Sequence, residues 1–223
     1  MLMRPRDLQR YLKDVGWPRS PEPPPSSQGV AEPEIRSDET LDALARSADG
    51  CSLCRLSEKR QTVVFGEGHP QAPVLFVGEG PGADEDRTGR PFVGQAGQLL
   101  DQMIFAMGFE RHEVYIANVV KCRPPGNRDP QEDEMAACAP YLERQIELIA
   151  PRVLVALGKP ASRRLTGSSK PMGAMRGRWS SYRGIPLMPV FHPAYLLRNQ
   201  AAKPQVWQDL KLILQRLQAT AEE

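Results

Sequence analysis

The residues of this 223-residue chain whose spacing most directly indicates chemistry are its four cysteines. Cys51 and Cys54 are separated by two residues, which allows both sulfurs to reach one metal centre, and Cys122 and Cys138 follow singly. Four thiolates can bind zinc or an iron–sulfur cluster. Zinc ribbons usually carry two close pairs, so the wide spacing of Cys122 and Cys138 mildly favours iron–sulfur. The alternative is that all four are buried, reduced thiols, which explains the close pair less well.

A second chemical candidate is the loop Gly78-Glu79-Gly80-Pro81-Gly82, which follows an apolar run. Its glycines would let backbone amides approach a ligand closely. The loop lacks the dinucleotide spacing, Pro81 removes an amide, and no Lys-Ser or Lys-Thr follows as in a P-loop. The acidic Glu79 disfavours a phosphate and favours a neutral or cation-like reacting centre. A plain strand–helix turn is the alternative interpretation.

Three further side chains stand at positions where a ligand could be recognised. Phe92, between Pro91 and Val93, could stack on a planar base, although read alone it is better explained as core. Asn118 interrupts an apolar strand pattern, where Asn is unfavourable, and this indicates a side chain that reads a ligand. His192 ends another apolar run. A lone histidine at a strand end is usually structural, but this one shares its expected sheet edge with the other candidates.

The elements that must position these residues alternate along the chain. We expect strands at 74–77, 114–120, 152–157 and 185–191, and helices at 95–107, from Asp129-Pro130 onward, and at 204–217. Such alternation predicts an α/β fold with a parallel sheet covered by helices on both faces. Ligands of such sheets bind beyond the carboxyl ends of the strands, where the candidates lie.

The N-terminal region differs in composition from the rest. Residues 1–36 read as an extension with a short helix at 4–16 and a linker rich in Pro and Ser, and we expect the folded domain to span 37–223. Ser37-Asp38-Glu39-Thr40 would cap a helix that runs to about Ala48. The extension either binds an unidentified protein partner or is disordered, and its composition favours disorder.

Composition and charge limit the class of protein. The chain has no apolar run long enough for a signal peptide or a membrane span, so we expect a soluble, cytoplasmic protein without a membrane partner. The net charge is only +2, yet no Asp or Glu occurs from Leu148 to Gln208, a segment with ten Lys and Arg. This favours a nucleic-acid partner. The alternative is that acids from the acid-rich stretch Asp129 to Glu147 fold against the basic face.

Taken together, these stretches resemble the thermostable, iron–sulfur type of uracil-DNA glycosylase, family 4. The similarity lies in CSLC, VGEGPGADEDRTGRPFVGQAGQLLDQM, VYIANVVKCRPPGNRDP, the single Cys138 and VFHPAYLLRN. It extends from about Cys51 to Leu217 and leaves out the N-terminal extension. The order of these motifs makes the resemblance specific.

The resemblance implies a fold, a cofactor and a reaction. The fold would be a three-layer αβα sandwich with a four-stranded, mainly parallel sheet, and the chain a monomer. A [4Fe–4S] cluster with a structural role would be bound by all of the cysteines, Cys51, Cys54, Cys122 and Cys138. The reaction would be base excision repair: hydrolysis of the N-glycosidic bond of deoxyuridine in DNA, which releases uracil and leaves an abasic site.

The resemblance also implies residue roles. Uracil would be flipped out of the DNA onto Phe92, with Asn118 at its Watson–Crick edge and the Glu79-Gly80-Pro81 backbone in contact with it. Glu79 and His192 would be catalytic, His192 near the uracil carbonyl oxygen. One of three residues just after His192 would wedge into the duplex: Leu196, Leu197 or Arg198.

One departure from the superfamily concerns the carboxylate that activates water. Better-known members carry an Asp and a Tyr where this chain has Gly80 and Gly82. Glu79 is then the expected substitute, with Asp84 and Glu85 as alternatives, and Glu85 could also fill the space that a thymine methyl would need.

Three other functions would explain part of the sequence. A non-catalytic DNA-binding protein with a structural metal centre would leave Glu79, Asn118 and His192 without roles. In a redox carrier that uses the cluster, Asn118 and Phe92 would be incidental. A relative that traps uracil covalently would carry a basic insertion with a histidine in the loop after the glycine motif or after the second expected strand. Here the loop after the second strand reads RPPGNRDP and has no histidine.

Overall fold

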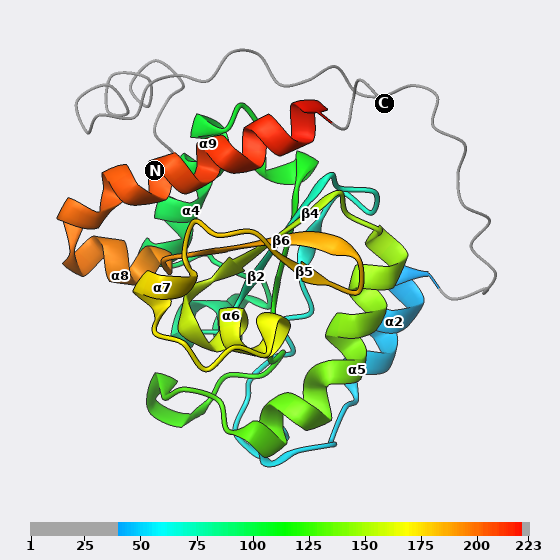
Figure 1. Ribbon diagram of the computed structural model, residues 1–223. Helices are drawn as coiled ribbons and strands as arrows, with labels where there is room; N and C mark the ends of the chain where they lie inside the picture. The colour runs from blue at the N-terminus through cyan, green and yellow to red at the C-terminus, as the bar shows by residue number, and fades with distance from the viewer. Residues whose placement is uncertain (1–39, 220–223) are drawn as a thin grey trace.

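The computed structural model describes residues 40–219, so the predicted helix at 4–16, the linker and the expected boundary at Ser37 lie outside the described residues. Within that range one six-stranded sheet has the order β1-β3-β2-β4-β6-β5 (Figure 1). Its four central strands are parallel: β3 (Tyr115–Asn118), β2 (Val74–Gly78), β4 (Val153–Leu157) and β6 (Ile185–Val190). These are the four strands that the apolar runs predict, with ends that differ by a few residues.

The two edge strands were not predicted from the sequence, and they make the sheet six-stranded instead of four-stranded. β1 (Glu67–Gly68) and β5 (Ser180–Tyr182) each pair antiparallel with a neighbour. β1 is too short to show an alternating pattern, and β5 is polar. A two-residue turn with positive φ at Arg183 and Gly184, 49° and 86°, joins β5 to β6, as right-twisted hairpins require.

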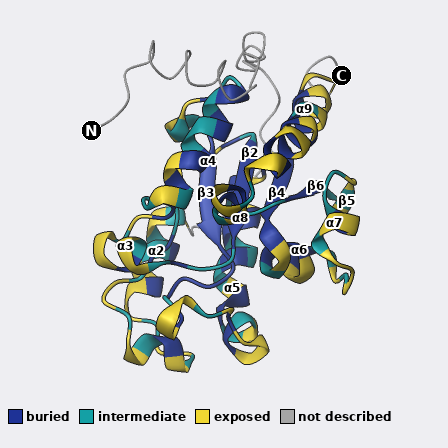
Figure 2. Cartoon of the chain, turned by 90° about the vertical axis from the view of Figure 1, so that its left-hand side faces the viewer, coloured by how far each residue is buried: buried dark blue, intermediate teal, exposed yellow. Residues whose placement is uncertain are grey.

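Helices cover both faces of the sheet, which confirms the three-layer αβα sandwich. α4 (Gln95–Ala106) and α9 (Lys203–Ala219) pack on the face that carries Phe76 and Val155. α5 (Glu132–Ile149) and α6 (Gly158–Thr166) pack on the face that carries Leu75 and Leu154. Successive strand residues thus enter opposite cores. Figure 2 shows the buried strands between the helical layers.

Shorter elements connect these layers. The remaining helices are α2 (Leu41–Asp49), α3 (Ala83–Thr88), α7 (Met172–Met175) and α8 (Pro193–Arg198), with single 3₁₀ turns at η1 (Arg55–Glu58), η2 (Arg111–Glu113), η3 (Pro125–Asn127) and η4 (Gln200–Ala202). Thr40 caps α2 by accepting from the amide of Ala43 at 3.2 Å. Between residues 40 and 219, no helix has the combined length and apolar character needed to cross a membrane.

The start of α5 corrects the prediction of a helix from Asp129-Pro130. The helix begins at Glu132, and the Gln131 amide donates to the Glu134 carboxylate at 2.8 Å in a capping box. Arg128 makes a two-pronged ion pair with the same buried carboxylate, at 2.6 and 2.8 Å. Asp129 therefore lies in the preceding loop, where it is exposed.

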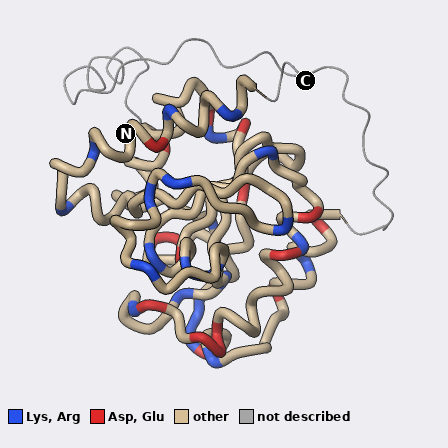
Figure 3. Tube along the Cα trace, viewed as in Figure 1, with Lys and Arg blue, Asp and Glu red and all other residues tan. Residues whose placement is uncertain are grey.

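The acid-free basic segment is partly neutralised within the fold. Arg183 lies 2.8 Å from both Glu143 and Glu147 of α5, and Arg164 lies 3.6 Å from Glu143. Figure 3 shows acidic and basic residues side by side where α5 passes the β5–β6 turn. Acids do fold against this part of the segment, as the alternative interpretation expected. Exposed cations of the segment that have no ion pair in the described range include Lys159, Arg163 and Arg198.

Candidate active site

The carboxyl ends of the central strands surround an open pocket of about 570 Å³. β2 leads into Glu79, β3 ends at Asn118, and His192 follows β6 by two residues. All of these residues line the pocket, together with Phe92 and the Gly80-Pro81 backbone. The parallel topology thus brings together the residues that the sequence singled out, from positions more than a hundred residues apart.

Phe92 and Asn118 meet over Gly78 at the inner end of the pocket. Gly78 and Asn118 are register partners in the parallel β2–β3 pair. A Cβ at Gly78 would lie 2.4 Å from Asn118 Oδ1 and 2.5 Å from Phe92 Cζ, so glycine is required for this approach. The Phe92 ring also lies beside the His192 ring, with a centroid distance of 5.6 Å.

Asn118 Oδ1 is a buried acceptor without a hydrogen-bond partner, and Asn118 is only 1% exposed. An unsatisfied buried polar group costs about 1–3 kcal/mol, which a ligand donor would recover. The Asn118 carbonyl, by contrast, accepts from the buried Lys121 ammonium at 2.9 Å. The backbone of this residue is fixed, and its side-chain amide is left for a ligand that carries an N–H.

His192 lines the pocket, and one of its ring nitrogens is already hydrogen-bonded within the fold. Its Nδ1 accepts from the Ala194 amide at 3.1 Å at the start of α8. Since a backbone N–H can only donate, the neutral ring carries its proton on Nε2. Burial, with a further contribution from Arg198, lowers the pKa of His192 to about 4, which the Glu85 charge opposes. At neutral pH the site therefore offers an uncharged N–H donor.

Glu79 is the half-buried carboxylate of the pocket. Burial, and secondarily the charge of Asp129, raises its pKa to about 7. Asp129 lines the same pocket from the loop before α5. A carboxylate with a pKa near neutrality can act as a base without being fully protonated at physiological pH.

The two alternative carboxylates are less available to a substrate. Glu85 Oε1 accepts from the amides of Val93 and Gly94 at 2.8 and 3.0 Å, and Oε2 accepts from the Gly82 amide at 3.1 Å. Glu85 therefore joins the glycine loop to the loop that carries Phe92. Asp84 is exposed and pairs with Arg87 at 3.1 Å on α3.

Steric contacts explain why glycine occupies positions 80 and 82. A Cβ at Gly80 would lie 2.7 Å from a methyl of Val120, so the superfamily's Asp does not fit there without a shift. A Cβ at Gly82 would lie 2.7 Å from Glu85 Oε2. The Glu85 carboxylate occupies the space beside Gly82, where a larger side chain would stand.

The three candidate DNA-wedge residues have different surroundings. Leu196 is 0% exposed and belongs to the core beneath α4 and α9, so it cannot reach DNA from its place in the fold. Leu197 is 40% exposed, and Arg198 is exposed and lines the pocket. Of these three residues, Leu197 and Arg198 have exposed side chains.

The four cysteines are free thiols that line one small cavity. Cys51 and Cys54 are half-buried, and Cys122 and Cys138 are buried. Arg60 donates to Cys122 Sγ at 3.2 Å, and the Lys121 amide donates to Cys138 Sγ at 3.3 Å. Burial nevertheless raises the pKa of the Cys138 thiol to about 11 and that of Cys122 above its ordinary value. Between residues 40 and 219, no group of three or more His, Cys, Asp or Glu side chains is arranged to hold a metal ion.

Sequence reasoning missed part of the pocket wall. The loop after β3 and the start of α8 contribute further lining residues, namely Pro124, Asn127, Arg128, Asp129 and Tyr195. The sequence did contain an indication of this loop. The segment RPPGNRDP is rich in Pro, Gly, Asn and Asp and follows a strand, which is typical of functional loops.

The comparisons with known proteins agree with this geometry. The family model of the uracil DNA glycosylase superfamily matches residues 65–211. The fold and the pocket thus define a member of that class.

Similar proteins narrow the class. The chain is 46% identical over 168 residues to the type-4 uracil-DNA glycosylase of Thermotoga maritima. That alignment covers 74% of this chain and 86% of the relative. It is 42% identical over 184 residues to the type-4 enzyme of Sulfurisphaera tokodaii (78% and 84%), and 39% over 185 residues to that of Archaeoglobus fulgidus (78% and 92%). The chain belongs to the type-4 uracil-DNA glycosylases, as its motifs predicted.

Proposed function

We propose that this protein removes uracil from DNA in base excision repair by hydrolysing the bond between uracil N1 and deoxyribose C1′. The observation that carries the proposal is the unpaired, buried Asn118 Oδ1 at the inner end of the pocket. It suits the N3–H of uracil, because that group donates a hydrogen bond. The stacking ring of Phe92 and the donor of His192 stand beside it.

Base recognition uses shape and hydrogen bonds. A flipped uracil stacks on Phe92, its N3–H donates to Asn118 Oδ1, and its O4 accepts from the Asn118 amide group. A cytosine ring has no N–H at N3 and would leave the buried acceptor unpaired, which disfavours it. We assign the carboxylate of Glu85, beside Gly82, the role of excluding the 5-methyl group of thymine. Glu85→Ala should raise the ratio of thymine to uracil release.

Bond cleavage leaves positive charge on the sugar and places the bonding electron pair on uracil. His192 donates a hydrogen bond from Nε2–H to O2 of the leaving base and so stabilises the uracil anion. The ionised Glu79 stabilises the sugar cation and accepts a proton from the water that adds to C1′. The leaving uracil anion later takes a proton from solvent. At neutral pH His192 is uncharged, and the pKa of about 7 leaves a substantial fraction of Glu79 ionised and able to act as the base.

The DNA surface extends from the pocket toward α6 and α8. Lys159 and Arg163 line a neighbouring groove that shares Asp129 with the pocket. Such exposed cations suit phosphates of the strand that flanks the uracil. Leu197 or Arg198 would fill the gap that the flipped nucleotide leaves.

We also propose that Cys51, Cys54, Cys122 and Cys138 bind a [4Fe–4S] cluster. All four thiols line one cavity, as the ligands of such a cluster must, and the wide sequence spacing of Cys122 and Cys138 is unlike that of a zinc ribbon. The donors from Arg60 and Lys121 are of the kind that stabilises cluster sulfurs. The cluster would join the segment before η1 to α5 and to the loop after β3, a structural role.

Metal analysis tests the cluster. Anaerobically purified protein should contain equal iron and acid-labile sulfide, about four of each per chain, and absorb as brown iron–sulfur proteins do. Cys138→Ser should lose iron, whereas Ser52→Ala, an exposed position between the paired cysteines, should keep it. One zinc per chain without sulfide would contradict the proposal.

A strand-cleavage assay tests the function. A labelled DNA strand with one uracil is incubated with the protein and then treated with alkali, which cleaves any abasic site. We expect cleavage at uracil and none in a matched strand with thymine. An intact uracil strand that remains bound to the protein would favour the non-catalytic DNA-binding module instead.

A further inference from the structure

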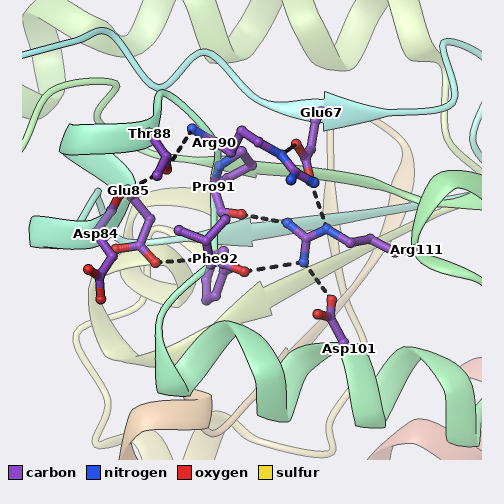
Figure 4. Close-up of polar contacts among 10 residues, drawn as sticks. Glu67, Asp84, Glu85, Thr88, Arg90, Pro91, Phe92, Asp101 and Arg111 are labelled. Atoms are coloured by element: carbon purple, nitrogen blue, oxygen red, sulfur yellow. Dashed lines mark hydrogen bonds and ion pairs between the residues drawn. The ribbon is translucent and has the colours of Figure 1, made fainter. Parts of the chain in front are cut away.

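Phe92 has an unusual backbone conformation for an aromatic residue. Its φ is 50°, in the left-handed region that L side chains rarely adopt, and it is buried. A bulky residue stays in such a conformation only when its surroundings over-determine it. Figure 4 shows the contacts that hold the loop from Arg90 to Gly94 in this conformation.

Arg111 contacts the carbonyl side of this loop. Its guanidinium donates to the carbonyl of Phe92 at 3.2 Å and to the carbonyl of Pro91. Two carboxylates orient the guanidinium: Glu67 accepts from Nε at 2.7 Å, and Asp101 of α4 accepts from Nη1 at 2.5 Å. Arg111 thus joins the edge strand β1, the helix α4 and the loop that carries Phe92.

The amide side of the same loop is held independently. Glu85 accepts from the amides of Val93 and Gly94 at 2.8 and 3.0 Å. Gly97 admits the Phe92 carbonyl to the start of α4, because a Cβ there would lie 1.9 Å from that oxygen. The Phe92 peptide is therefore held on opposite sides by Arg111 and Glu85.

We propose that Arg111 is a positioning residue for uracil removal, which acts by fixing Phe92 in its left-handed conformation beside Asn118 and His192. The proposal rests on the stacking role given to Phe92 under the proposed function. Arg111 does not line the base pocket, so it acts through Phe92. A lysine cannot reproduce the effect, because its single ammonium lacks the planar fork that reaches two carbonyls and two carboxylates together.

The experiment compares Arg111→Lys with a matched control, Arg90→Lys. Arg90 also pairs with Glu67, at 2.8 Å, but the hydrogen bonds of its guanidinium in the described residues go to Glu67 and not to the Phe92 carbonyl. Under single-turnover conditions we expect Arg111→Lys to release uracil about 10- to 100-fold more slowly, since displacements near 1 Å cost rates of that order. We expect Arg90→Lys to stay within about twofold of wild type, and both variants to bind abasic DNA normally.

A double-mutant cycle separates positioning from a general structural role. Because Arg111 acts through Phe92, Arg111→Lys should slow uracil release no further in a Phe92→Ala background. An equal loss in both backgrounds would overturn the proposal. If Arg111→Lys does not fold, Asp101→Asn replaces it in the double-mutant cycle, because this change removes a carboxylate that orients the same guanidinium. The outcome that would overturn the proposal is then the same. A wild-type protein that releases no uracil would refute the proposed function instead.

Discussion

Replacement of Gly78 by alanine is a direct test of the pocket's inner end. The added methyl group would lie 2.4 Å from Asn118 Oδ1 and 2.5 Å from Phe92 Cζ. Ordinary contacts of this kind start at 3.4 Å, so the amide and the ring must each retreat by about 1 Å (3.4 − 2.4 and 3.4 − 2.5). Both side chains are buried, which leaves them little free space.

The expected magnitudes follow from this displacement. A shift of about 1 Å in groups that hold a substrate can lower the rate about 10²-fold. Overpacking costs about 1–3 kcal/mol of folding stability, which lowers the Tm of a domain of this size by roughly 2–12 °C. Gly78→Ala should thus lose far more activity than its modest stability loss explains at a temperature well below the Tm.

The assay measures uracil release from a single-uracil strand with the enzyme in excess, alongside thermal unfolding. Gly173→Ala is the matched control, because a Cβ at that position in α7 meets nothing within 4 Å. The control should retain wild-type rate and Tm. If Gly78→Ala releases uracil at the wild-type rate, Phe92 and Asn118 do not form the base-binding end of the pocket, and the reasoning fails.

Three further predictions concern charge and proton position. The kcat/KM of the wild type should fall as the pH drops through about 7, because the Glu79 carboxylate takes up a proton. The kcat/KM of Glu79→Gln should be low and independent of pH across this range. Asp129→Asn removes a like charge near Glu79, so in this variant the fall in kcat/KM should occur at lower pH. A profile of Glu79→Gln with the wild-type midpoint would assign that limb to another group. His192→Ala should reduce single-turnover release about 10²–10³-fold with unchanged affinity for abasic DNA, and an unaffected rate would exclude it as the donor to uracil. Lys159→Gln and Arg163→Gln should each weaken DNA binding and lower the steepness of the plot of log affinity against log salt concentration by about one. Binding curves that match the wild type at every salt concentration would show that α6 does not contact the DNA.

The central strands and the site could be predicted from the sequence for the same physical reason. A parallel strand buried on both faces needs a continuous apolar run, so polar residues at its end stand out. Asn118 stood out because it interrupts such a run, and His192 because it ends one. The parallel topology then brings both residues to one edge of the sheet. Phe92 was found only through its motif, since an aromatic residue read alone is most often core.

What the sequence did not reveal depends on contacts distant in the chain. Nothing local marks Arg111 as the partner of a carbonyl nineteen positions earlier. Asp129 was read as a helix cap because Asp-Pro is a strong start signal, whereas the capping box of Gln131 and Glu134 prevailed. Leu196 follows His192 closely but faces inward, because the pitch of α8 turns it into the core.

The amount of free uracil released from DNA per protein chain decides whether this protein is a glycosylase that acts through the Asn118 pocket. Wild type and Asn118→Ala are incubated with excess single-uracil DNA, and the free base is quantified by chromatography. We expect many equivalents of uracil from the wild type. We expect a loss of about 10²-fold or more in Asn118→Ala, because the substitution removes both hydrogen bonds to the base. Full release by Asn118→Ala would place the reaction outside this pocket, and no release by the wild type would show that the protein is not a glycosylase.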